Sequence, residues 1–313
     1  MAASSAARPR GAVSSDLPEL ARIASGALRW DADAAELPRL LWPAAEAGFA
    51  VVAEVDGVPA GFALGSLGPV PADPAGERRG HVNLLAVDAA ARRRGIGSAL
   101  LAELESRLFA SGASAVLLGG ATPVFAWAGV DARYTAARCL AEARGYEQIR
   151  EGVNMLVELD AAARAGLLGT EADERRLAGE GITVRRLTEE DRERISPWLA
   201  AWGGTWKQET LSTLGRENAA THVAVLDDGT PEARYVGFAS HGVNRVGLFG
   251  PMGTDRALRK SGIGGVLLRR CLRDIRDAGL AGAEICWVGP VAFYARTVDA
   301  YVNRVFWIYR KGR

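Results

Sequence analysis

Two glycine-rich turns that begin with basic residues are the clearest chemical feature of this sequence. One reads Arg92-Arg93-Arg94-Gly95-Ile96-Gly97-Ser98, and the other reads Arg259-Lys260-Ser261-Gly262-Ile263-Gly264-Gly265. Each turn follows an apolar, strand-like run and leads into an amphipathic helix. Such a turn offers unpaired backbone N–H groups and the positive end of a helix dipole, and glycine lets the main chain approach a ligand closely. The two turns therefore predict sites for a phosphorylated small molecule.

The turns belong to a longer internal repeat. Their offset is constant (259 − 92 = 167), and without a gap it also pairs Leu100-Leu101 with Leu267-Leu268 and Gly112 with Gly279. A single copy would also fit a tight strand-to-helix turn that binds nothing. Repetition together with the following helix indicates a duplicated domain.

Composition narrows the class of protein. With 313 residues, 49% of them hydrophobic and 24% charged, the chain suits two globular domains of about 150 residues each. The formal net charge of +1 gives no reason to expect nucleic acid or a membrane as a partner. Cys139, Cys271 and Cys286 are far apart and the histidines lack metal-ligand spacing, so no metal site is predicted. No secretory signal is recognisable, and we expect a cytoplasmic protein.

The elements that position the two turns repeat in one order, β-α-α-β-β-β-α-β-α-β. We predict a first domain over residues 1–160, a charged and alanine-rich linker over 161–180 that could be partly helical, and a second domain over 181–313. In each domain a strand precedes the turn, a helix follows it, and a further strand ends the domain. The predicted closing strands are residues 153–159 and 302–309.

Both turns fit the pattern Arg/Gln-x-x-Gly-x-Gly/Ala, which resembles the acyl-CoA pyrophosphate loop of the GCN5-related N-acetyltransferases (GNAT). The resemblance covers nearly the whole chain. It implies an α/β (α+β) fold of two tandem GNAT (acyl-CoA N-acyltransferase) domains, each a mixed, mostly antiparallel central sheet with a V-shaped splay and flanking helices. It also implies acetyl-CoA as the cosubstrate.

By the same resemblance, the strand before each turn binds the pantetheine arm of acetyl-CoA through its backbone. The corresponding residues are Leu85-Ala86-Val87 and Met252-Gly253-Thr254. A main-chain N–H in this stretch would also stabilise the oxyanion that forms at the thioester carbonyl. Gly250, Pro251 and Gly253 interrupt the second strand, which indicates either a bulge or a strand end.

The family commonly carries a tyrosine that protonates the departing thiolate, and Tyr294 in the Phe293-Tyr294 segment resembles it. In the first half an alignment on Gly145-Tyr146 puts Ala141 at this position, whereas the ungapped repeat puts Trp127 there. We therefore expect the C-terminal domain to catalyse. The N-terminal domain is expected to have lost the chemistry, and whether it still holds acetyl-CoA stays open.

The attacking amine must lose a proton, which calls for a carboxylate or a histidine. No carboxylate lies in residues 246–254, the strand on which the family often carries one. We name His241 first, because it follows the preceding strand. Glu284 and a water chain without a dedicated base remain alternatives.

The expected acceptor is a primary amine of a small molecule. The segments around Phe249 and Trp287 are similar to tandem bacterial acetyltransferases of glucosamine and glucosaminides, so an amino sugar is the best guess. Trp202, Trp206 and Trp287 could stack on a sugar, and Asn244 could bind its hydroxyls. A mycothiol-synthase-like or antibiotic acetyltransferase and a non-enzymatic acyl-CoA-binding protein are the alternatives. The oligomeric state is open, with a homodimer as one option.

Overall fold

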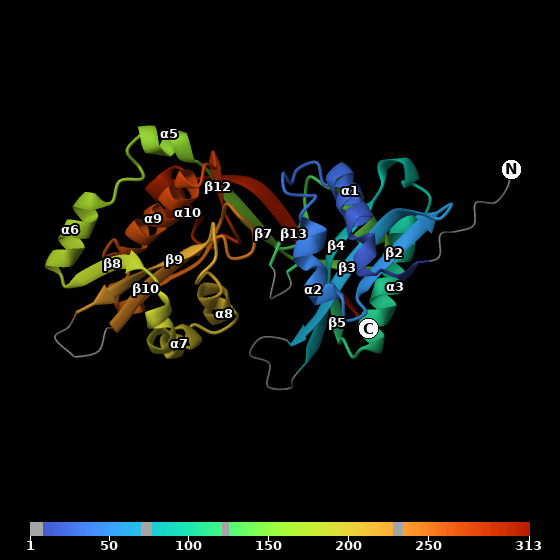
Figure 1. The fold of residues 1–313 in the computed structure, drawn as a ribbon, viewed down its shortest axis with the longest axis horizontal. Helices are drawn as coiled ribbons and strands as arrows, with labels where there is room; N and C mark the ends of the chain where they lie inside the picture. Colours follow the sequence, from blue (N-terminus) through green and yellow to red (C-terminus); the bar gives the residue numbers. More distant parts are fainter. Residues whose placement is uncertain (1–8, 70–76, 121–124, 228–233) are drawn as a thin grey trace. The chain divides into compact units, whose positions relative to one another are not determined.

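The chain forms two units in the computed structural model, which describes residues 9–69, 77–120, 125–227 and 234–313 (Figure 1). Unit 1 consists of Met1–Gly152 together with Phe306–Arg313, and unit 2 is Val153–Val305. The borders differ from the predicted ones in a specific way. Each closing strand belongs, in part or in full, to the unit that the sequence did not predict for it.

Unit 1 begins with a short strand and two helices, which precede the main strands of its sheet. Its elements are β1 (Arg10–Gly11), α1 (Leu17–Ala27), α2 (Leu37–Ala45), β2 (Ala50–Val55), β3 (Val58–Pro69), β4 (Arg78–Val87), α3 (Ile96–Ala110), β5 (Ala115–Leu118), β6 (Val130–Asp131) and α4 (Thr135–Ala143). The strand order is β1-β2-β3-β4-β5-β13, where the β13 segment is the end of the chain. Only β4 and β5 are parallel within this order.

Helices cover both faces of the unit 1 sheet. Leucines of α1 and α2, among them Leu20 and Leu41, form one core with Phe62 and Leu64 of β3. Leu100 and Leu104 of α3 belong to a second core on the other face. This two-sided burial explains the long apolar runs of the strands, which show little alternation.

Unit 2 repeats the arrangement with two additional helices at its start. Its elements are the second half of β7 (Glu147–Glu158), α5 (Leu159–Arg164), α6 (Glu171–Gly179), β8 (Ile182–Arg186), α7 (Arg192–Ala200), α8 (Trp206–Leu211), β9 (Ala220–Leu226), β10 (Arg234–His241), β11 (Leu248–Thr254), α9 (Ile263–Asp277), β12 (Gly282–Ile285), α10 (Val291–Val298) and the start of β13 (Tyr301–Gly312). The strand order is β8-β9-β10-β11-β12-β7. Both units thus have the GNAT fold expected from the sequence.

The predicted linker 161–180 contains the end of α5 and all of α6, and it belongs to unit 2. Leu168 and Leu177 are buried in the core of unit 2, and α6 packs along α9. Oppositely charged side chains line the two helices: Arg269 pairs with Asp173 at 2.9 Å and Arg270 with Glu174 at 2.7 Å. The charge that suggested a solvated linker is therefore a helix–helix contact.

The predicted closing strands are also assigned differently. Residues Met155–Glu158 of β7 pair with β12 of unit 2, and Arg310–Gly312 of β13 pair with β5 of unit 1. The hydrophobic pattern of a strand records that it is buried and not which sheet buries it. No helix within the described ranges is long and apolar enough to cross a membrane.

Candidate active site

The sheet of unit 1 opens where β4 leaves β5. The two strands pair in parallel from Arg79 to Val82, and the N–H of Gly119 donates to the carbonyl of Val82 at 2.8 Å. From Asn83 onward β4 pairs only with β3 in the described part of the chain. The backbone edge of Leu85, Ala86 and Val87 is therefore available on the β5 side, which is the V-shaped splay that the resemblance implied.

The turn after this strand has left-handed backbone at equivalent positions in both units. Gly95 and Gly262 cap α3 and α9 with φ of 79° and 94°. Arg93 and Lys260 also have positive φ, 63° and 74°, which costs a non-glycine residue about 1–3 kcal/mol. Both copies thus share the same unusual conformation, and left-handed residues in a turn are a feature of backbone sites that bind anions.

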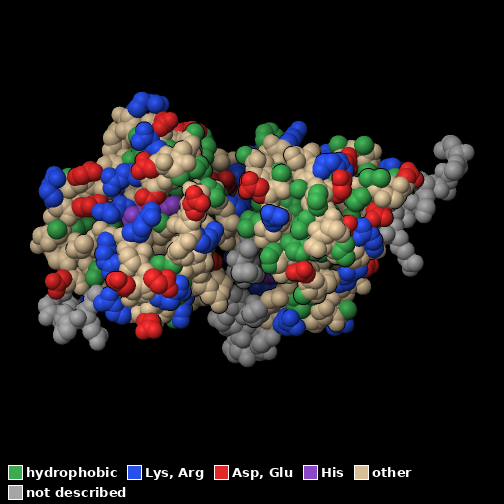
Figure 2. Space-filling view, viewed as in Figure 1, with side chains coloured by type: hydrophobic (Ala, Val, Ile, Leu, Met, Phe, Trp, Pro, Cys, Tyr) green, Lys and Arg blue, Asp and Glu red, His purple; other side chains and the backbone are tan. Residues whose placement is uncertain are grey.

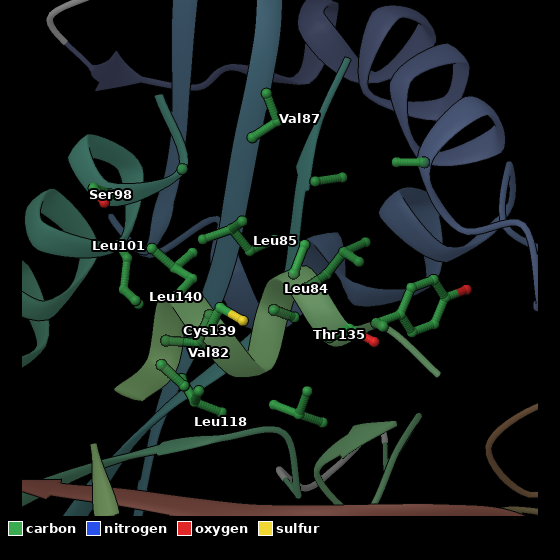
Figure 3. A pocket seen from close by; sticks show the side chains of 18 of the residues that line it. Val82, Leu84, Leu85, Val87, Ser98, Leu101, Leu118, Thr135, Cys139 and Leu140 are labelled. Carbon is green, nitrogen blue, oxygen red and sulfur yellow. The ribbon is translucent and has the colours of Figure 1, made fainter. Parts of the chain in front are cut away.

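A cavity of about 830 Å³ lies beside the turn of unit 1. Its wall includes Arg92, Gly95, Gly97 and Ser98 of the turn, and Figure 3 shows Leu85, Leu101 and Leu140 within it. A basic turn at one end, an open strand edge and an apolar wall fit a long thioester with a pyrophosphate. Arg92 donates through Nε to the carbonyl of Val87 at 3.1 Å, which fixes the turn against the strand.

Polar residues line another part of the same cavity. Tyr134, just before α4, donates through its hydroxyl to Oδ2 of Asp31 at 2.9 Å, and Trp127 Nε1 donates to Oδ1 at 3.2 Å. Asp31 is buried, with 6% of its surface exposed. Asn83 also lines the cavity and is bound through Nδ2 to Ser66 Oγ at 3.1 Å. None of these three interactions was predicted from the sequence. Two of them join Asp31, in the connection between α1 and α2, to segments about a hundred residues away.

In unit 2 the splay contains the predicted bulge. β11 pairs with β12 at Leu248 and Phe249. Against β10, Phe249 pairs with His241 and Met252 pairs with Ala239, so β11 has one more residue than β10 between these pairs. Gly250 and Pro251, joined by a cis peptide bond, lie at this shift. The bulge interpretation of Gly250-Pro251 is therefore confirmed.

The turn of unit 2 contacts an arginine that the sequence analysis missed. Arg176 of α6 donates to the carbonyl of Ser261 at 2.7 Å and stands where a Cβ on Gly262 would lie. A Cβ added to Gly264 would lie 3.5 Å from Cε of Met252 and 3.6 Å from Cζ of Phe293. Leu140 takes the place of Phe293 beside Gly97 in unit 1.

Leu140 and Phe293 thus occupy corresponding positions in the two units. The residues that follow them, Ala141 and Tyr294, therefore correspond as well. Trp127 lies outside α4, so the alignment on Gly145-Tyr146 is the correct one. Ala141 is fully buried in the core of unit 1 and lines its cavity. A phenol at this position is absent from unit 1.

Tyr294 lies on α10 between two aromatic rings. Its ring meets those of Phe249 and Phe293 edge-on, with centroid distances of 6.2 and 5.0 Å. Burial raises the pKa of Tyr294 to about 12, with the adjacent Cys286 thiol adding to the shift. Because of this raised pKa, the phenol is protonated at neutral pH. Its hydroxyl makes no hydrogen bond with the described residues, so the O–H donor is not engaged.

The two cysteines of unit 2, Cys271 and Cys286, do not suit nucleophilic catalysis. Burial raises the pKa of both Cys271 and Cys286, which keeps the thiols protonated. Glu209 of α8, by contrast, is a carboxyl whose pKa burial raises while Thr205 donates to it at 2.5 Å. Helix α8 contacts β11, and Glu209 is a candidate base that the sequence did not single out.

His241 is not in the setting predicted for a base. Its Nε2 lies 3.3 Å from Oδ2 of Asp274 on α9, and the side chain is buried. His222 and Arg186 contact the same oxygen at 2.9 and 2.6 Å. This cluster joins α9 to the sheet and encloses His241, so its role as a base stays a prediction. Glu284, the alternative base, is bound by Asn154 and paired with Arg304.

This cluster predicts a pH-dependent contribution to stability. Hydrogen bonds from His222, His241 and Arg186 hold the pKa of Asp274 well below its ordinary value of 3.8, against the opposing effect of burial. The carboxylate therefore stabilises the fold above pH 3.8, and this contribution is lost as the pH falls below that value. Asp274→Asn should cost about 2 kcal/mol at pH 7 and less at pH 3. Urea unfolding at both pH values measures this, with the exposed pair of Asp160 as control (Asp160→Asn); an equal cost at both pH values would contradict the assignment.

The tryptophans differ in their availability. Trp202 and Trp206 pack against Phe238 in a cluster with Trp198, and Trp202 covers Gly253. The rings of these two tryptophans are used in packing within unit 2, which does not favour the stacking on a sugar that the sequence analysis considered. Trp287 follows β12 and is 36% exposed. Asn244 lies in the loop between β10 and β11.

Charged groups of both signs are interspersed on the visible face of the described residues (Figure 2).

Comparison with known proteins agrees with the fold. Residues 17–126, all in unit 1, match the Acetyltransferase (GNAT) family. No curated protein matches the chain significantly. A glucosamine N-acetyltransferase region of a fungal multi-domain GH3 β-N-acetylglucosaminidase has a TM-score of 0.74 at 16% identity over 97% of this chain, which spans 38% of that protein.

Two further structures are similar over nearly their whole length. A tandem GNAT protein from the clavulanic acid biosynthesis pathway has a TM-score of 0.66 at 17% identity, with 97% of each chain covered. A GCN5-related N-acetyltransferase from Sphaerobacter thermophilus has a TM-score of 0.62 at 20% identity, covering 97% of this chain and 95% of its own. At these identities the structures establish the tandem fold alone. Together with the family match, which covers residues 17–126 of unit 1, they show that the chain has the tandem GNAT fold.

Proposed function

We propose that the protein transfers acetyl directly from acetyl-CoA to a primary amine of a small molecule. The observation that carries the proposal is the unit 1 cavity, which joins an anion-binding turn to an open strand edge. In the transfer the amine nitrogen bonds to the acetyl carbon, the carbon–sulfur bond breaks, one proton leaves the amine and the thiolate receives one. No covalent enzyme intermediate is needed, which agrees with the protonated thiols.

We further propose that unit 2 performs the transfer and that unit 1 holds acetyl-CoA. Tyr294 supports this division, since unit 1 has Ala141 instead. In unit 2, Tyr294 would protonate the thiolate, and Glu209 would take the proton from the amine. The turn Arg259–Gly265 and the edge Met252–Thr254 would hold the cosubstrate there, and Arg176 would add a guanidinium near its phosphates.

An amino sugar is the proposed acceptor. Support comes from the fungal relative, whose name gives glucosamine as its acceptor, and from the exposed ring of Trp287. A mycothiol-synthase-like substrate or another amine, such as an aminoglycoside, is the second candidate. A binding protein without turnover is disfavoured by the free phenol donor of Tyr294.

Matched substitutions in the two turns test this division. Gly97→Ala and Gly264→Ala each add one methyl at the anion-binding turn, and the nearest atoms are 3.4 and 3.5 Å away, so both variants should fold. Each methyl would keep a phosphate from close approach to the main chain. We expect Gly264→Ala to lower turnover at least tenfold and Gly97→Ala to abolish acetyl-CoA binding at unit 1.

Turnover is measured as thiol release from acetyl-CoA with glucosamine, kanamycin, spermidine and a short peptide as acceptors. Binding is measured by calorimetry, which resolves one or two cosubstrate sites. Loss of turnover in Gly97→Ala alone would move the chemistry to unit 1. Cosubstrate binding without thiol release from any acceptor would overturn the transferase proposal for these amines.

A further inference from the structure

One buried side chain of the unit 1 cavity has an unused hydrogen-bonding atom. Asn83 is 7% exposed and lines the cavity. Its Nδ2 donates to Ser66 Oγ, while Oδ1 is buried and has no hydrogen-bond partner. Buried polar atoms of folded proteins are nearly always paired, so an unpaired one beside a cavity points to a ligand group that completes it.

The position of Asn83 on β4 matters as much as its burial. Leu64 pairs with Leu84 and Gly65 with Val82, so Asn83 is an extra residue in a bulge. It is also the first residue after the pairing with β5 ends. From Val87, next to the turn, it lies four residues back, or about 13 Å along the strand. A cosubstrate with its phosphates at the turn and its arm along β4 would therefore bring its thioester toward Asn83.

A carboxylate accompanies this site. Tyr134 lines the same cavity and donates to the buried carboxylate of Asp31. An amine supplies N–H donors that match the unpaired acceptor atom of Asn83.

We propose that unit 1 binds the acceptor amine as well as acetyl-CoA, and that Asn83 Oδ1 accepts a hydrogen bond from the N–H of the amine. Unit 1 is then a second acceptor site and more than a holder of the cosubstrate. The inference rests on the proposed function. It extends that function, since the sequence analysis expected the N-terminal domain to have lost the chemistry and the proposal gives this domain an acceptor site.

Two substitutions of Asn83 separate a binding role from a structural one. Asn83→Leu removes the acceptor at similar volume, and Asn83→Asp keeps an acceptor for the amine and for the Ser66 hydroxyl. We expect Asn83→Leu to weaken amine binding about tenfold, as for one hydrogen bond to a buried group, while its melting temperature stays equal or rises. Asn83→Asp should stay within about threefold of the wild type.

The measurement is calorimetric titration of the CoA-saturated full chain with glucosamine, kanamycin and spermidine. Asn303 of unit 2 is a matched control, since its Oδ1 is also buried and unpaired, and Asn303→Leu should leave binding unchanged. The inference is overturned if no probe binds, if Asn83→Leu binds every probe as the wild type does, or if Asn83→Asp loses binding as Asn83→Leu does. Turnover in the Gly264→Ala comparison decides the proposed function separately.

Discussion

Removal of the last eight residues, Phe306–Arg313, is expected to unfold unit 1, although unit 1 is otherwise the N-terminal part of the chain. Phe306 and Tyr309 are fully buried and Ile308 is 2% exposed. Truncating a buried aromatic residue costs about 3–5 kcal/mol, and a domain is stable by only about 5–15 kcal/mol. The deletion removes two such residues, together about 6–10 kcal/mol, and also the strand that pairs with β5, so its cost is comparable to the whole stability of a domain.

Hydrogen exchange measures this effect for each unit separately. Amides of α3 should lose protection in the truncated protein, while those of α9 should keep it. Tyr309→Ala should reduce the stability of unit 1 by about 4 kcal/mol. Val302→Ala on the same strand, where the side chain is 44% exposed, is the control and should change stability by less than about 0.5 kcal/mol. Full protection of α3 after truncation would contradict the assignment of this strand to unit 1.

The features that the sequence predicted best are those set by local backbone chemistry. Gly95 and Gly262 are required by left-handed backbone at a helix start, so their spacing alone located both turns. Gly250-Pro251 marked the bulge of β11 for a similar reason, because neither residue suits a regular ladder. Such signals need no knowledge of distant contacts.

The features that the sequence did not predict depend on partners far along the chain. The charge of residues 171–174 suggested a linker, and only the arginines of α9, about a hundred residues later, make it a packed helix. His241 lies at a strand end, which suggested a base that faces the substrate, and its contact with Asp274 joins residues that are 33 positions apart. Asn83 carries no motif, and its unpaired oxygen follows from the bulge and from Ser66. A sequence pattern does not show which buried polar atoms lack a hydrogen-bond partner.

Tyr294→Phe is expected to lower turnover about 100-fold or more with little change in acetyl-CoA affinity, if unit 2 performs the transfer. General acid catalysis by a positioned side chain contributes about 10²–10⁴-fold. The substitution removes only the hydroxyl, which has no hydrogen bond to the described residues, and leaves the ring contacts with Phe249 and Phe293. The fold should therefore be as stable as that of the wild type, so a loss of turnover would report on chemistry.

Tyr301→Phe makes the same chemical change on an exposed residue of unit 2 whose hydroxyl donates to Glu158, and it should leave turnover unchanged. The pH profile adds a second readout. Because the pKa of Tyr294 is raised to about 12, the phenol keeps its proton across neutral pH, and the acid should not limit the rate below about pH 10. A base such as Glu209 would instead set the acidic limb, which Tyr294→Phe should leave in place. Unchanged turnover in Tyr294→Phe would assign the transfer to another donor, and Tyr134 of unit 1, already bound to Asp31, would then be the next phenol to substitute.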